Sequence, residues 1–215
     1  MFGTRDDNKI IMASQIAHIV YAKNFLENDH PSWINKDEFI LGCVFPDIRR
    51  IDETISRKAS HMHFEKVDLD FSGLNSFEAG WKFHLYCDMK REEILKKYDF
   101  FSLSNSGDFY GQAAKELEDK LIYNEYNNWE KLVHLFNNVP HNGNPLGVSH
   151  ETMGLWYAII ANYIKEKPNS KSIHVFFSKQ TSFVGSADGI VESIKELEQN
   201  KEVVAILKKV FKEII

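Results

Sequence analysis

The sequence predicts an all-α protein that folds as one helical domain over residues 1–215. Apolar residues recur at intervals of three or four over most of the chain, which is the spacing of one helix face. Serine, asparagine and aspartate residues stand before several of these segments, and such residues cap helix N-termini. The alternation typical of strands is weak, and only residues 173–177 resemble a short strand. We therefore expect a compact multi-helix fold.

Three helices are expected in the N-terminal half. The first covers residues 14–27 and begins at a serine that can cap it. Asp37 can cap a second helix, which ends just before Pro46 because proline cannot continue a regular helix. After a turn, Ser76 is expected to cap a third helix over residues 77–98, whose first half is apolar and whose second half is charged.

The C-terminal half is expected to hold longer helices that support the first ones. Apolar spacing predicts a single long helix over residues 112–136, followed by a loop rich in Asn, Pro and Gly. Another helix is expected over residues 149–165, ending near Pro168. The chain closes with one apolar helical stripe over residues 191–214.

Composition and charge limit the classes of protein to which this chain can belong. The 43% of hydrophobic residues provide enough apolar surface for a core. The net charge of -5, with both signs interspersed, does not indicate stable nucleic-acid binding. The first residues lack the apolar core of a secretory signal, and no apolar run reaches the ~20 residues of a membrane span, so a cytoplasmic protein is expected. Cys43 and Cys87 are expected to be reduced core residues.

Two metal-binding residue types stand four positions apart in Gly80-Trp-Lys-Phe-His84-Leu-Tyr-Cys-Asp88. Four residues is about one helical turn, so His84 and Asp88 share a helix face and one cation can touch both. Imidazole nitrogen and carboxylate oxygen are ligands that Zn²⁺ accepts at about 2.0 to 2.2 Å. Taken alone, the pair also fits an ordinary surface or helix-cap pair.

Further candidate ligands precede this pair. His18 lies among apolar residues and needs partners for its ring nitrogens once buried, which either a backbone carbonyl or a metal satisfies. Asp47 fits either a helix-start carboxylate or a ligand, and His61 and His63 follow. These segments are expected to pack as neighbours, which favours a shared metal site built from His18, Asp47, His61, His84 and Asp88.

The order of these segments resembles the zinc-dependent phospholipase C family and its relatives, which include single-strand-specific nucleases of the same helical fold. In that family a histidine on an early helix is followed by Gly-x-x-x-Pro-Asp, then by Ser/Thr-His, then by Gly-x-x-x-His-x-x-x-Asp. The matching segments here are His18, Gly42-Cys-Val-Phe-Pro-Asp47, Ser60-His61 and Gly80-Trp-Lys-Phe-His84-Leu-Tyr-Cys-Asp88. The resemblance covers about residues 14–95, the metal-site half, and leaves residues 112–215 as supporting helices. Its ordered combination is specific, although each piece alone is not.

The resemblance implies two divalent metal ions, most simply zinc. One would be held by Asp47, His61, His84 and Asp88, and the second by Asp88 and His18, so that Asp88 is a shared carboxylate. Such a carboxylate offsets the repulsion of two cations at the ~3.5 to 4 Å of two-metal sites. His63 competes with His61 as a ligand, and Glu65 joins the site if the segment after His61 is helical. The secreted members also use an N-terminal tryptophan and a further histidine with a His-x-x-x-Glu pair, which have no counterpart here, so two metals are expected and not three.

The implied activity is that of a metal-dependent hydrolase in which water activated by two metals attacks a phosphate ester. Asp47 is expected to be a metal ligand or a proton acceptor, and the substrate is a small-molecule or lipid phosphate ester. Two alternatives remain. One is a nucleotide phosphohydrolase resembling the histidine-aspartate domain class, although the chain has no adjacent His-Asp dipeptide. The other is a non-catalytic helical metal-binding module. The sequence specifies neither the oligomeric state nor the native metal, since such ligands also accept Mn²⁺, Fe²⁺ or Ni²⁺.

Overall fold

Helices account for the regular structure of the chain. The computed structural model describes residues 14–28, 31–103, 109–140 and 145–214, and no strand occurs among them, which confirms the all-α prediction. The described α-helices are α1 (Gln15–Asn28), α2 (Lys36–Val44), α3 (Arg57–His61), α4 (Ser76–Lys97), α5 (Tyr110–Ile122), α6 (Trp129–Asn137), α7 (His150–Ile164), α8 (Ser170–Ser178), α9 (Ala187–Gln199) and α10 (Lys201–Glu213). Short 3₁₀-helices join some of them, including η1 (Phe45–Arg50), η3 (Tyr123–Glu125) and η5 (Thr181–Phe183).

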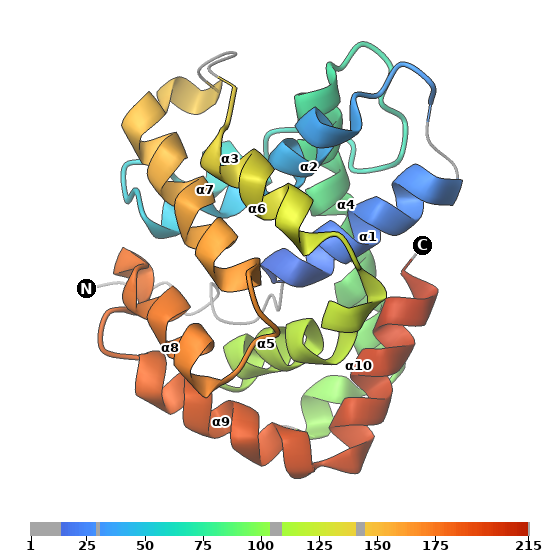
Figure 1. Cartoon of the computed structure of the whole chain (residues 1–215). Coiled ribbons are helices and arrows are strands. Elements are labelled where there is room, and N and C mark those ends of the chain that lie inside the picture. Colours follow the sequence, from blue (N-terminus) through green and yellow to red (C-terminus); the bar gives the residue numbers. More distant parts are fainter. Residues whose placement is uncertain (1–13, 29–30, 104–108, 141–144, 215) are drawn as a thin grey trace, which may run out of the picture.

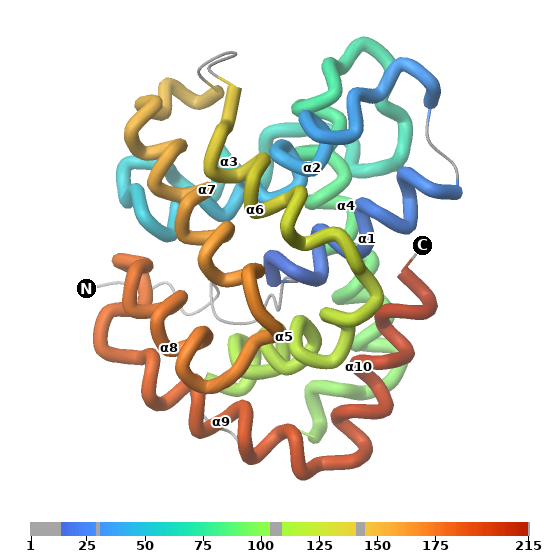
Figure 2. Tube along the Cα trace, viewed as in Figure 1, coloured from blue at the N-terminus to red at the C-terminus, as the bar shows by residue number. Residues whose placement is uncertain are grey.

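The helices pack in two groups around α1 and α5 (Figure 1). Helices α1, α2 and α4 contact one another, and α6 and α7 pair beside them. Below this group, α8, α9 and α10 run around α5, as the path of the chain in Figure 2 shows. Buried apolar side chains from both groups form one continuous core, so the described chain is a single domain. None of its helices has the length and apolar character that crossing a membrane requires.

Helices α2 and α4 touch through their backbones at two glycines. A Cβ atom at Gly42 would lie 1.9 Å from the carbonyl oxygen of Phe77, and one at Gly80 would lie 1.9 Å from that of Phe39. No side chain fits between the helices at these points. The glycines that begin two of the quoted sequence segments therefore set the crossing of α2 and α4.

The N-terminus of α1 is held by side chains of α5. The carboxylate of Asp119 accepts hydrogen bonds from the backbone N–H groups of Ala17 (2.7 Å) and Ile16 (3.2 Å), and Glu116 accepts one from the hydroxyl of Ser14 (2.9 Å). The first N–H groups of a helix lack partners within the helix and interact favourably with negative charge. A neighbouring helix thus caps α1.

Two of the expected helix caps are wrong by one or two residues. Asn35, not Asp37, caps α2, because its side chain accepts hydrogen bonds from the N–H groups of Asp37 and Glu38. Asn75 and Glu78 form a capping box at the start of α4, while the hydroxyl of Ser76 accepts a hydrogen bond from the backbone N–H of Asn35. Neighbouring residues offered equivalent caps, and the local sequence does not distinguish between them.

The single helix expected over residues 112–136 is wrong as well, because it is two helices, α5 and α6. The chain turns in η3, and the ring of Trp129 stacks on Tyr123 with centroids 4.7 Å apart. The indole N–H of Trp129 also donates to the carbonyl oxygen of Tyr123 (3.2 Å). These contacts fold α6 back towards α7.

Residues 173–177 are not a strand but part of α8. Ile173, Phe176 and Phe177 are all buried, and their spacing is that of one helix face. The stripe over residues 191–214 belongs to two helices, α9 and α10, because Asn200 ends the first and its side chain caps the second. The two cysteines are free and buried, as expected.

Candidate metal centre

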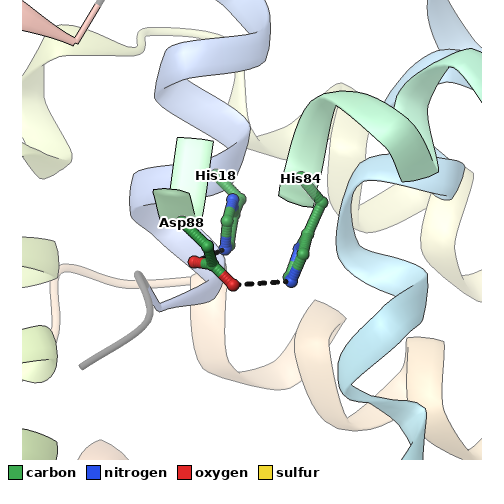
Figure 3. A group of neighbouring side chains, drawn as sticks. All are labelled: His18, His84 and Asp88. Carbon is green, nitrogen blue, oxygen red and sulfur yellow. Dashed lines mark ion pairs between the residues drawn. The ribbon is translucent and has the colours of Figure 1, made fainter. Parts of the chain in front are cut away.

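The His84–Asp88 pair of α4 meets His18 of α1 inside the protein (Figure 3). Nε2 of His18 lies 3.3 Å from Oδ1 of Asp88, and Nε2 of His84 lies 3.4 Å from Oδ2 of the same carboxylate. The two imidazole rings stack with centroids 3.7 Å apart. The ligand atoms of the three residues all lie within 4.8 Å of one another, so they can hold one metal ion.

The distances between the ligand atoms and the burial of this cluster fit a cation. Two ligand atoms at about 2.1 Å from a tetrahedral ion are separated by roughly 3.4 Å, close to the nitrogen–oxygen distances observed here. His18 and His84 are fully buried and Asp88 nearly so. Despite their distances to Asp88, the Nε2 atoms of both histidines lack a hydrogen-bond partner among the described residues. Buried polar atoms without such partners are unfavourable unless another ligand satisfies them.

The backbone of α2 orients the ring of His84. Nδ1 of His84 lies 2.8 Å from the carbonyl oxygen of Cys43, which can only accept a hydrogen bond. Nδ1 therefore carries a proton, so that in the neutral ring Nε2 is the atom with the lone pair and faces the cluster. Metal-binding histidines are commonly fixed in this way by a second hydrogen bond. The close crossing at Gly42 and Gly80 brings the Cys43 carbonyl within reach.

The charge states of the cluster suit metal binding. Burial, assisted by the neighbouring His84, lowers the pKa of His18 to about 4. Burial alone would raise the pKa of Asp88, but His84 and His18 outweigh it and hold that pKa well below its usual range. At neutral pH the cluster thus contains a neutral His18 imidazole and an ionised carboxylate, the forms that bind metals.

His61 and Asp47 form a second pair next to this cluster. The ring of His61 lies edge-on to that of His84 with centroids 5.3 Å apart, and its Nε2 lies 3.8 Å from Oδ1 of Asp47. Nδ1 of His61 lies 2.8 Å from the hydroxyl of Ser60. Burial, with His84, lowers the pKa of His61 to about 3, so this imidazole is also neutral at pH 7.

Short helix α3 is fixed to α4 beside this pair. The indole N–H of Trp81 donates to the carbonyl oxygen of Ser60 at 2.7 Å, and the hydroxyl of Ser56 caps α3 by accepting from the N–H of Ala59. These contacts hold the last residue of α3, His61, against the site. The five residues singled out in the sequence thus form a continuous chain of neighbours: His18, Asp88, His84, His61 and Asp47.

Asp47 is fully buried and already has protein partners. Its Oδ1 lies 2.9 Å from Nε of Arg50, and its Oδ2 accepts a hydrogen bond from the side-chain amide of Gln15 at 2.7 Å. Burial alone would raise the pKa of Asp47, but Arg50, followed by His84 and His61, outweighs it and holds the pKa far below its usual range. A carboxylate with so low a pKa is a weak proton acceptor at neutral pH.

The two less central candidates lie outside these contacts. The exposed His63 stacks on the indole of Trp81 with centroids 4.4 Å apart. Glu65 is exposed and lies in chain that is not helical, because α3 ends at His61. The helical spacing on which the expectation for Glu65 depended is therefore absent.

Three polar residues around the site were not singled out in the sequence. Gln15 lies one turn before His18 on α1, and Arg50 lies three residues after Asp47 in η1, so both have a spacing that could have indicated them.

Lys115 of α5 gave no such signal. It is 4% exposed, and burial, together with Arg50, lowers its pKa to about 7. Asp47 and Asp88 act on this pKa in the opposite direction, which shows that Lys115 lies within electrostatic reach of the site.

Comparisons of the chain with protein-family models, with curated proteins and with solved structures find no match. The resemblance to zinc-dependent phospholipase C stays a prediction based on the ordered motifs. The buried cluster is an observation that is independent of it.

Proposed function

We propose that the protein is a metal-dependent hydrolase acting on a phosphate ester, with His18, His84 and Asp88 at the centre of its metal site. The observation that carries the proposal is the arrangement of two buried imidazole Nε2 atoms around one carboxylate. A bound divalent cation would supply Lewis acidity and lower the pKa of a water molecule towards neutrality. The protein's own residues keep His18 neutral, keep Asp88 ionised and orient the ring of His84.

A second metal ion is part of the proposal. The two oxygens of Asp88 face different histidines, Oδ1 facing His18 and Oδ2 facing His84. A carboxylate shared between two cations would use one oxygen for each, and the positions of the two oxygens support this role. His61 and Asp47 are the proposed additional ligands beside His84. To bind a metal ion, Asp47 must loosen its ion pair with Arg50. Zinc is the metal that these ligands fit most simply. The cytoplasmic location of the protein stays a prediction.

The test measures metal content and turnover in the same preparations. We expect the wild-type protein to retain zinc or another divalent metal and to hydrolyse a bis-aryl phosphodiester or an aryl phosphomonoester. His84→Ala is expected to lose both properties. His174→Ala is the matched control, since His174 is a half-exposed histidine that pairs with Asp188 away from the site. A His84→Ala protein that keeps its metal and its turnover contradicts the proposal.

A non-catalytic metal-binding module is the second candidate. Complete burial of His18 and His84 is also typical of structural metal sites, which are closed to solvent. Under this alternative, His84→Ala loses the metal and stability, but the metal-loaded wild type shows no turnover on either substrate. The two candidates therefore differ in the activity of the loaded wild-type protein.

A further inference from the structure

Arg49 is a half-buried cation beside the candidate metal centre. It lies in η1, two residues after Asp47 and next to the buried Arg50. Whereas Arg50 pairs with Asp47, Arg49 forms no ion pair within the described part of the chain, and its buried Nε has no hydrogen-bond partner there. A guanidinium group carries five N–H donors in a fixed plane. Arg49 is therefore a charged donor for which the described protein offers no acceptor.

Arg49 lies at the site because the same short helix, η1, carries the buried Asp47 two residues earlier and Arg50, which pairs with that carboxylate. Burial lowers the pKa of Arg49, Asp47 and Asp88 raise it, and Arg50 and Arg57 lower it. Both carboxylates of the metal centre are thus close enough to act on its charge. The guanidinium stays protonated at any physiological pH, so this position is always cationic.

Arg49 is the cation of the site that no carboxylate of the described residues pairs. Arg50 forms an ion pair with Asp47, and the buried Glu116 acts on Arg50 and Lys115. An uncompensated charge away from water is costly unless it is paired. A divalent cation on the His18–His84–Asp88 cluster would add further positive charge near Arg49. The arrangement consequently favours an anionic ligand between Arg49 and the cluster.

We propose that Arg49 binds the phosphoryl group of the substrate beside the metal centre. This inference rests on the proposed function and adds the residue that recognises the reacting group. A planar guanidinium matches two oxygens of a phosphoryl group at once, which a point charge such as an ammonium does not. Arg50 is less suited to this role because it already forms an ion pair with Asp47.

The test uses the full chain with the metal content it has after purification, matched between preparations. Binding of inorganic phosphate is measured by titration calorimetry at low ionic strength for the wild type, Arg49→Gln, Arg49→Lys and Lys58→Gln. Lys58 is the matched control, because it is an exposed cation of the adjacent α3. Loss of a charge-assisted hydrogen bond is expected to weaken phosphate binding by about tenfold to a hundredfold in Arg49→Gln. Arg49→Lys, which keeps the charge but not the planar fork, is expected to be intermediate, and Lys58→Gln to change binding by less than about twofold.

Each outcome decides the inference. Equal phosphate affinity in Arg49→Gln and Lys58→Gln, or a wild type that does not bind phosphate, overturns it, provided that circular dichroism shows the variants folded. If the wild type hydrolyses phosphate esters and Arg49→Gln does so with unchanged KM, the proposed function stands and the role of Arg49 fails. If no preparation shows turnover but Arg49→Gln alone loses phosphate binding, the role of Arg49 stands and the hydrolase proposal fails.

Discussion

The backbone contact between α2 and α4 gives the sharpest prediction about stability, for the substitution Gly80→Ala. The added Cβ atom would lie 1.9 Å from the carbonyl oxygen of Phe39 and 3.0 Å from the backbone nitrogen of Cys43. Ordinary contact begins at 3.4 Å, so the helices must separate by about 1.5 Å at this point. Neither obstructing group is a side chain that can rotate away.

The expected loss of unfolding free energy is about 3 kcal/mol. Overpacking of a well-packed core typically costs about 1 to 3 kcal/mol and sometimes more, and a backbone obstacle favours the upper end. Moving the helices apart also forfeits a quarter to a half of the dispersion energy across a gap of about 0.5 to 1 Å. The better helix propensity of alanine returns at most about 1 kcal/mol.

The measurement is urea denaturation of Gly80→Ala beside Gly154→Ala. Gly154 lies within α7, and a Cβ atom there meets nothing within 4 Å, so its alanine variant is expected to gain about 0.5 to 1 kcal/mol from helix propensity. A Gly80→Ala protein as stable as Gly154→Ala would refute the argument from backbone contact. Failure of Gly80→Ala alone to fold agrees with it. Metal affinity should fall as well, since the separation lengthens the hydrogen bond that orients His84.

Three further predictions address the groups around the site. The pKa of Lys115 is about 7 in the folded protein and about 10.5 in the unfolded chain. Burial of Lys115 therefore lowers the unfolding free energy most below pH 7, and this loss shrinks as the pH rises towards 10. The stability advantage of Lys115→Met over the wild type should accordingly shrink by up to about 1.4 kcal/mol per pH unit across this window. Asp119→Ala removes the acceptor for two buried N–H groups of α1 and is expected to cost about 2 to 4 kcal/mol in urea denaturation. Trp81→Phe removes the donor to Ser60 and is expected to lower turnover several-fold through His61, with loss of the second metal ion while the His18–His84–Asp88 cluster keeps the first.

Each of these predictions has an outcome that contradicts it. A pH-independent difference between Lys115→Met and the wild type would mean that the Lys115 amine is not desolvated in the folded state. A loss below 1 kcal/mol in Asp119→Ala would show that water replaces the cap of α1. Loss of all metal in Trp81→Phe would mean that the hydrogen bond to α3 supports the whole cluster and not His61 alone.

The sequence was a good guide to helices whose caps and apolar spacing agree. Helix α7 begins after Ser149, as predicted, because the serine hydroxyl accepts the N–H of Thr152 and the apolar face follows directly. The break between α5 and α6 was missed because apolar spacing continues across it, and only the stacking of Trp129 on Tyr123 reveals the turn. Residues 173–177 were ambiguous for the related reason that a short apolar run fits both a strand and a buried helix.

The sequence by itself determined the helical class and that His84 and Asp88 share a face of α4, because these depend on spacing within one segment. Only the tertiary structure decided that His18 meets this pair, that the Cys43 carbonyl fixes the ring of His84, and that Arg50 and Gln15 engage Asp47. These contacts join residues that are distant along the chain. Their formation depends on how closely α2 and α4 approach at Gly42 and Gly80 and on how α5 holds the start of α1, and local spacing specifies neither.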